Sequence, residues 1–130
     1  MAGILTDEMI RLLEEPHMAH LATVNADGSP QVSPVWVHTD GEAILMNTAT
    51  GRIKHRNLVR DPRAAVSIAD AAHPYSRTLI ARGRVELITE GGLEHIDSLS
   101  RKYDDLPWEA QPGDVRVIIR LIPETAAPAN

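Results

Sequence analysis

Hydrophobic and polar positions alternate with strand periodicity along most of the chain. This pattern predicts strands at residues 17–24, 31–38, 42–47, 64–69, 77–89 and 115–122. Turn sequences at 25–28 and 39–41 separate the first three strands, as in β-hairpins. Pro34 cannot donate a ladder hydrogen bond, which predicts a sheet edge, a bulge or a strand end there. Gly83 marks an expected bulge in the longest strand.

Three shorter segments have helical spacing. They are residues 6–15, 52–60 and 91–102. Thr6 is a suitable N-cap for the first helix, and Asp61-Pro62 ends the second. Together the segments predict one domain over residues 1–130, with a flexible tail at 124–130. The expected class is mainly β (α+β): a six-stranded antiparallel barrel with short flanking helices.

Composition narrows the function classes. The chain has no cysteine, which excludes disulfides and thiol catalysis and fits a cytoplasmic protein. No run of about 18 apolar residues predicts a membrane span, and the acidic N-terminus does not resemble a signal peptide. The net charge of −5 argues against nucleic-acid binding. With four aromatic residues and no Phe, the core is expected to be aliphatic, leaving the aromatics available for a ligand site or subunit contact.

Basic residues are concentrated in one segment of this acidic chain. Five of the 13 Lys and Arg residues fall between Arg52 and Arg63, where a predicted strand gives way to a predicted helix. Side-chain cations and helix N–H groups at such a junction act on the same anion. The segment therefore indicates a phosphorylated small ligand. A solvated helix face that aids solubility is the alternative explanation.

Three motifs together carry a family resemblance. They are the stretch from His20 to Trp36, the Thr-x-x-x-Arg-x-Lys-x-x-Asn-Leu-x-Arg-Asp-Pro-Arg run from Thr48 to Arg63, and Gly-Arg-Val-Glu-Leu at 83–87. The chain resembles the pyridoxamine-phosphate-oxidase-like flavin and deazaflavin oxidoreductases over about residues 4 to 122. Within that superfamily it is most similar to the short branch that binds coenzyme F420. The resemblance implies a split β-barrel and a homodimer with two cofactor sites at the interface.

The resemblance also implies which residues bind the cofactor. Arg52 and Lys54 would hold the phosphate and the glutamate tail, and the loop from Tyr75 to Arg77 would close over the site from the partner chain. The remaining implied cofactor-binding residues are Ser33, Pro34, Val35 and Trp36 beside the ring, Thr48, Ala49 and Thr50 as donors, and Arg56.

Several of these residues have a plain structural alternative. Thr48 and Thr50 are equally suited to capping the helix that follows them. Trp36 is also suited to packing in the core or at the dimer interface. Trp108 is suited either to packing at the dimer interface or to the rim of a substrate cleft. Asn57, Asp61 and Arg63 are expected to brace a turn rather than touch a ligand.

Catalytic groups are less well marked than the binding segment. Candidate proton donors are Tyr75, His73 and Tyr103, with solvent as the alternative. The six histidines lack paired ligand spacing on any predicted helix, so no metal site is expected.

Three functions fit these observations. The first is an F420H2-dependent reductase that transfers a hydride to a small conjugated acceptor, such as a quinone, enone or tetrapyrrole. The second is an FMN-dependent oxidase or reductase of the same fold, because FMN also carries a phosphate. The third is a non-catalytic cofactor or haem carrier or sensor. The extra arginines near Lys54 favour the longer anionic coenzyme F420 over FMN.

Overall fold

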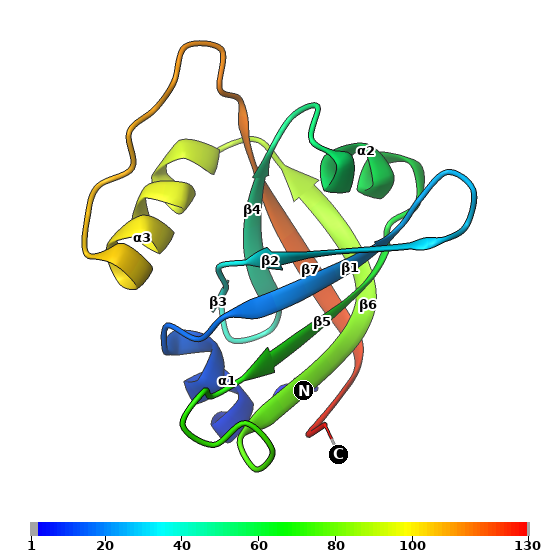
Figure 1. The fold of residues 1–130 in the computed structure, drawn as a ribbon, viewed down its shortest axis with the longest axis vertical. Helices are drawn as coiled ribbons and strands as arrows, with labels where there is room; N and C mark the ends of the chain where they lie inside the picture. The colour runs from blue at the N-terminus through cyan, green and yellow to red at the C-terminus, as the bar shows by residue number, and fades with distance from the viewer. Residues whose placement is uncertain (1–2, 130) are drawn as a thin grey trace.

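Over residues 3–129 the fold is a single curled antiparallel sheet with three helices around it (Figure 1). The structure is a computed structural model that describes residues 3–129. The helices are α1 (Asp7–Glu14), α2 (Ile53–Arg60) and α3 (Gly92–Asp104). The strands are β1 (Ala19–Val24), β2 (Pro30–Val35), β3 (His38–Thr39), β4 (Ile44–Ala49), β5 (Arg63–Ala69), β6 (Thr78–Ile88) and β7 (Arg116–Ala127). Their order is β2-β1-β5-β6-β7-β4-β3, so β2 and β3 are the two edges of an open half-barrel.

The predicted class, an antiparallel split barrel with short flanking helices, is confirmed, but the sheet has seven strands rather than six. The extra strand arises because the expected strand at 31–38 is divided in two. At Val37 the backbone N–H donates to Tyr103 Oη at 3.1 Å, and the carbonyl accepts from Lys102 Nζ at 2.6 Å. Side chains of α3 therefore take the place of a neighbouring strand at this point. Pro34 lies in the edge strand β2, and a sheet edge is one of the three positions that the sequence predicted for this proline.

The last strand is longer than predicted. β7 continues past Ile122 to Ala127, so residues 125–127 of the expected tail are paired with β6, and Glu124 is the residue skipped in the register. The pairing shifts register between Arg82 and Gly83, which confirms the predicted bulge. A Cβ atom on Gly83 would overlap the carbonyl oxygen of Ile122, so the two strands approach each other there as only glycine allows.

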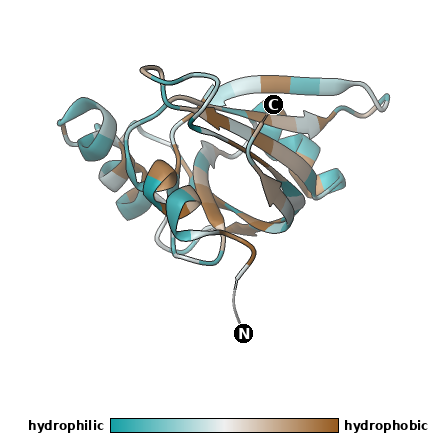
Figure 2. Ribbon diagram, turned by 90° about the horizontal axis from the view of Figure 1, so that it is seen from below, coloured by the Kyte–Doolittle hydropathy of each residue, from teal (hydrophilic) through white to brown (hydrophobic). Residues whose placement is uncertain are grey.

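The core is aliphatic, as expected. Its fully buried members, within the described part of the chain, are leucine, isoleucine, valine, methionine and alanine side chains. Figure 2 shows these apolar positions along the strands and on the inner sides of the helices. Thr6 caps α1 by accepting from the Met9 N–H at 3.2 Å, as predicted. Because the core needs no aromatic residue, Trp36, Tyr103 and Trp108 gather elsewhere.

None of the helices within residues 3–129 has both the length and the apolar character needed to cross a lipid bilayer.

Candidate functional site

A cleft of about 350 Å³ lies between α3, β4, β7 and the end of β2. Its lining joins segments that are far apart in sequence. The lining residues are Met18, Pro34, Val35, Trp36, Asn47, Thr48, Arg52, Lys54, Ile96, Leu99, Trp108 and Arg116. One wall is therefore apolar and aromatic, and the other is cationic.

Three cations line the cleft without a carboxylate among them. Arg52 and Lys54 come from the start of α2, and Arg116 comes from the start of β7. No aspartate or glutamate in the described chain lines the same space. Burial lowers the pKa of Lys54, and the positive charges of Arg52 and Arg116 lower it further. The three groups therefore repel one another, and an anion placed among them would relieve that repulsion.

The start of α2 adds backbone donors to these cations. Arg52 is the N-cap residue, and no side chain caps the helix. The first N–H groups of α2 therefore remain free to bind an acceptor, and the helix dipole favours an anionic one. The structure thus rejects helix capping as the role of Thr48 and Thr50, because Thr48 lies within β4 and its buried Oγ1 has no hydrogen-bond partner among the described residues.

Trp36 and Trp108 line the cleft, and Tyr103 supports Trp36 from behind. The Trp36 ring stacks on Tyr103 with centroids 5.4 Å apart and meets the edge of Trp108 at 6.4 Å. Tyr103 is fixed in turn, because its hydroxyl donates to the His17 carbonyl at 2.6 Å and accepts from the Val37 N–H. The Trp36 ring, stacked on Tyr103, and Pro34 give an apolar surface suited to a planar ring, and the Trp108 ring stands nearly perpendicular to Trp36.

Asn47 and Arg116 are the two polar cleft residues that sequence reasoning missed. Arg116 Nε donates to Asn47 Oδ1 at 2.9 Å, and the guanidinium lies 4.9 Å from the centre of the Trp108 ring. The alternation of Val115, Val117 and the following apolar residues places Arg116 on the outward face of a strand. In the structure α3 covers that face, so Arg116 is buried while Val115 is exposed. The local sequence, an arginine between two valines, does not indicate that a helix covers this face of the strand.

The predicted cofactor residues divide into two groups. Those that line the cleft are Pro34, Val35, Trp36, Thr48, Arg52 and Lys54. Those that do not line it are Ser33, Ala49, Thr50, Arg56, Tyr75 and Arg77. Of the second group, Ser33 and Ala49 adjoin lining residues in sequence, and Thr50 lies two positions from both Thr48 and Arg52. Arg56 is exposed on α2.

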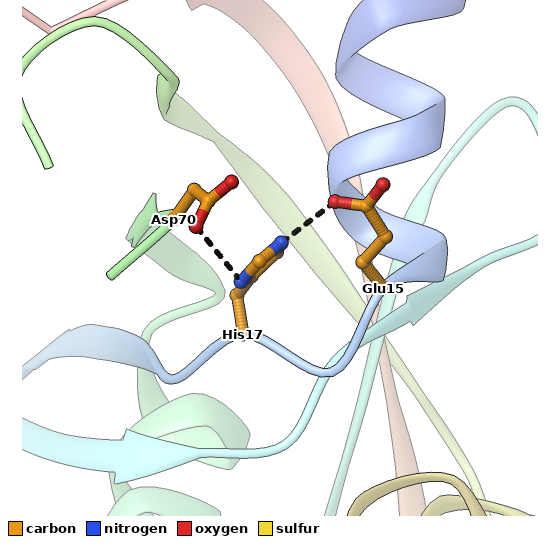
Figure 3. A group of neighbouring side chains, drawn as sticks. All are labelled: Glu15, His17 and Asp70. Atoms are coloured by element: carbon orange, nitrogen blue, oxygen red, sulfur yellow. Dashed lines mark hydrogen bonds and ion pairs between the residues drawn. The ribbon is translucent and has the colours of Figure 1, made fainter. Parts of the chain in front are cut away.

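Arg77 is already engaged in an ionic cluster at the α1 end of the sheet. Figure 3 shows the other members of this cluster, Glu15, His17 and Asp70. Its Nη1 lies 2.7 Å from both Glu15 Oε1 and Asp70 Oδ2, and His17 Nε2 lies 2.7 Å from the same Glu15 oxygen. The hydrogen bonds from Arg77 lower the pKa values of both carboxyl groups. The Glu15, His17 and Asp70 side chains are close enough to share a metal ion, and the Arg77 guanidinium offsets part of the charge of the two carboxylates. The cluster therefore fastens α1 to the β5–β6 loop.

The candidate proton donors do not line the cleft of their own chain. His73 and Tyr75 are exposed in the β5–β6 loop, with Tyr75 at 92% relative exposure. Tyr103 lies behind Trp36, and its hydroxyl hydrogen is used in the bond to His17; burial raises its pKa. Within the part of the chain described, no histidine, tyrosine, aspartate or glutamate faces the cleft.

The rest of the basic segment has the bracing role predicted for it. Buried Asn57 donates to Thr23 Oγ1 and Asn25 Oδ1, tying α2 to the β1–β2 hairpin. Asp61 and Arg63 form an ion pair at 2.7 Å. Only the first turn of the segment, with Arg52 and Lys54, therefore faces the cleft.

Comparisons with known proteins agree with this geometry. The sequence model of the pyridoxamine 5'-phosphate oxidase family matches residues 5–127. A solved structure named F420 reductase is 38% identical, covers 92% of this chain and 95% of its own, and superposes with a TM-score of 0.81. A conserved hypothetical protein from Mycobacterium tuberculosis is 23% identical, with 96% and 84% covered and a TM-score of 0.76. General stress protein 26 from Bacillus anthracis is 17% identical, with 92% and 89% covered and a TM-score of 0.71. The last two show the fold alone.

Proposed function

Because the chain belongs to the pyridoxamine 5'-phosphate oxidase family, we propose that its cleft binds a phosphorylated flavin-type coenzyme and that the protein is an oxidoreductase. The proposed coenzyme is F420. The proposed reaction is the F420H2-dependent reduction of a small conjugated acceptor, such as a quinone, an enone or a tetrapyrrole. The similarity to an F420 reductase over nearly the whole chain supports this choice.

One observation carries the proposal: a cationic cleft in an acidic protein. Arg52, Lys54 and Arg116 converge on one space that no described carboxylate lines, although the chain as a whole has a net charge of −5. Such an arrangement costs folding stability unless a bound anion offsets it. The uncapped start of α2 and the unpartnered Thr48 hydroxyl add donors of the kind that phosphate oxygens accept.

The two walls have different roles in this proposal. Arg52 and Lys54 bind the phosphate, the first as a planar fork and the second as a mobile charge. Pro34, Val35 and Trp36 form an apolar surface for the ring and exclude water from one of its faces. When bound, the reduced deazaflavin supplies a hydride to an electron-poor carbon of the acceptor. Because no carboxyl, imidazole or phenol group of the described chain faces the cleft, the proton is proposed to come from solvent or from a second subunit.

A homodimer is part of the proposal. The β5–β6 loop lies at the end of the sheet away from α2 (Figure 1), so it does not reach the cleft of its own chain. Tyr75 is exposed at the tip of this loop and is available to a partner's cleft, whereas Arg77 is held by Glu15 and Asp70. Of the two loop residues, Tyr75 is therefore the one proposed to act across the interface. Light scattering after size exclusion would measure the oligomeric state.

A fluorescence titration with F420, beside one with FMN, tests the coenzyme. The cations of the cleft suit the phosphate of F420 and that of FMN equally, so only a comparison of the two titrations separates the two coenzymes. Saturable micromolar or tighter binding of F420, with weaker binding of FMN, is the expected result. Preferential FMN binding would make the protein an FMN-dependent oxidase or reductase instead. If F420 binds tightly but its reduced form is oxidised by none of the quinone, enone and tetrapyrrole acceptors, a carrier or sensor role replaces catalysis.

A further inference from the structure

We propose that Arg116 is a third anion-binding residue of the cleft, one that engages a phosphate oxygen of the ligand together with Arg52 and Lys54. The identity of the ligand as a phosphorylated coenzyme rests on the proposed function. The assignment of Arg116 rests on its own surroundings, which fix its orientation but leave much of its charge unused.

Several contacts hold the Arg116 guanidinium in place. Its Nε donates to Asn47 Oδ1, and Asn47 is itself fixed because its Nδ2 donates to the Gly92 carbonyl at 3.1 Å and contacts His95 Nδ1 at 3.0 Å. The Trp108 ring covers the guanidinium, and the Trp108 backbone N–H donates to Asp97 Oδ1 at 2.8 Å. The group therefore points in one direction before any ligand binds, which lowers the entropy lost on binding.

The charge of Arg116 is only partly balanced. Its side chain is 7% exposed, and its one carboxylate contact runs from Nη1 to Asp114 Oδ1 at 3.5 Å. Its Nη2 makes no hydrogen bond to any residue between 3 and 129. Burial lowers the pKa of Arg116; Asp114 opposes this, and the charge of Arg52 adds to it. The free Nη2 nitrogen is not fully buried, so it is open to a ligand oxygen as its acceptor.

Arg116 also faces more than one part of the site. It lines the cleft and a neighbouring hollow of about 600 Å³ beneath the α3–β7 loop, and Arg52 and Trp108 line both as well. The two arginines thus stand where the two spaces meet. Because Glu109 and Asp114 line the hollow but not the cleft, an anion is favoured on the cleft side of this junction, where the lining residues it meets include both arginines.

A purely structural role for Arg116 makes a different prediction. If the side chain only ties β7 to β4 and α3, its replacement would lower the stability of the fold and weaken phosphorylated and phosphate-free ligands equally. If it binds the anion, the loss would fall on the phosphorylated ligand. The preference for phosphate is therefore the quantity to measure.

The experiment compares Arg116→Gln and Arg116→Lys with wild type, and uses Arg120→Gln as the matched control. Arg120 lies four positions further along β7, outside the cleft, and pairs with Asp40, Glu42 and Glu86. Each protein is titrated with F420 and with its phosphate-free deazariboflavin precursor, and separately with inorganic pyrophosphate. Circular dichroism and the melting temperature without ligand check folding.

The expected result is at least a tenfold loss of phosphate preference in Arg116→Gln and at least a threefold loss in Arg116→Lys, which keeps the charge but not the fork. Arg120→Gln is expected to keep the wild-type preference. An unchanged preference in Arg116→Gln would overturn the proposal; if that variant does not fold, Arg116→Lys decides in the same way.

The pyrophosphate titration separates this proposal from the proposed function. If wild type binds neither F420 nor FMN but binds pyrophosphate, and Arg116→Gln binds it at least tenfold less tightly, the function is wrong and the assignment of Arg116 stands. If wild type binds neither coenzyme and also no pyrophosphate, the assignment of Arg116 is overturned together with the function. The same holds if wild type and Arg116→Gln bind pyrophosphate equally.

Discussion

Gly92 of α3 packs against the backbone of Arg116 in β7 so closely that a Cβ atom on residue 92 would overlap the Arg116 carbonyl oxygen. Asn47 connects the same two residues, because its amide donates to the Gly92 carbonyl and its oxygen accepts from Arg116 Nε. The position of α3 on the sheet and the direction of the arginine are therefore set by one small contact region.

Gly92→Ala is expected to lower the free energy of unfolding by about 2–3 kcal/mol, because α3 or β7 must shift to make room. The same shift moves Arg116, so phosphate affinity should fall too. Chemical denaturation and a pyrophosphate titration measure the two effects. Gly3→Ala is the control, since a Cβ there meets only the Gly41 carbonyl oxygen at 4.0 Å. Wild-type stability in Gly92→Ala would contradict the close packing.

Replacing Arg52 and Lys54 together by alanine is expected to cost at least about 2 kcal/mol of coenzyme binding, or roughly thirtyfold in affinity, because two charge-assisted contacts are lost. Fluorescence titration measures it. The double control Arg11→Ala with Arg84→Ala removes the same charge from exposed positions outside the cleft. Equal losses in both double variants would show that net charge alone, rather than these two residues, drives binding.

His95 is expected to make the protein sensitive to mild acid. Burial lowers the pKa of His95 to about 4 in the folded state, against an unfolded value of 6.5. The unfolded chain therefore binds more protons between these values, so stability falls as the pH drops from 6.5 towards 4, by about 3 kcal/mol at most. Protonation also removes the Nδ1 acceptor that contacts the Asn47 amide.

The comparison of wild type with His95→Asn isolates this effect, since other acid-sensitive groups are common to both proteins. Denaturation midpoints between pH 4 and 7 are the measurement. The stability difference between the two proteins should narrow, or reverse in favour of the variant, as the pH falls. A difference that stays constant with pH would show that His95 does not titrate in this range.

Tyr103→Phe is expected to lower stability by about 2 kcal/mol while leaving the phosphate preference intact. The change leaves the His17 carbonyl and the Val37 N–H without their hydrogen-bond partner. Activity with reduced F420, normalised to folded protein, should persist, because the Tyr103 hydroxyl is bound behind Trp36. Loss of turnover with unchanged coenzyme affinity and stability would instead make Tyr103 the proton donor.

The sequence predicted those features that depend on local patterns. Alternating residues gave the long strands, Gly83 gave the bulge, Thr6 gave the helix cap, and the basic run from Arg52 gave one wall of the cleft. Each of these depends on neighbours a few positions away. The break at Val37 was not predictable, because it depends on Lys102 and Tyr103 some 65 positions later.

The polar cleft residues Asn47 and Arg116 were less accessible to sequence reasoning for the same reason. Asn47 is the last residue of a predicted strand and Arg116 alternates with apolar residues in another, and nothing near either position shows that α3 covers them. The loop at Tyr75 was placed at the site through the resemblance alone. Whether it reaches a partner's cleft depends on a subunit contact that one chain does not contain.

In the proposed function, the mutual repulsion in the cleft links coenzyme supply to the lifetime of the protein. Until an anion arrives, three like charges oppose the folding of the segments that carry them. A ligand at a hundred times its Kd adds about 2.7 kcal/mol to the free energy of unfolding, on top of whatever repulsion it relieves. In a cell short of the coenzyme, a larger fraction of the protein would therefore be unfolded and degraded. The steady-state level of the protein, measured with and without the coenzyme, would report on cofactor availability.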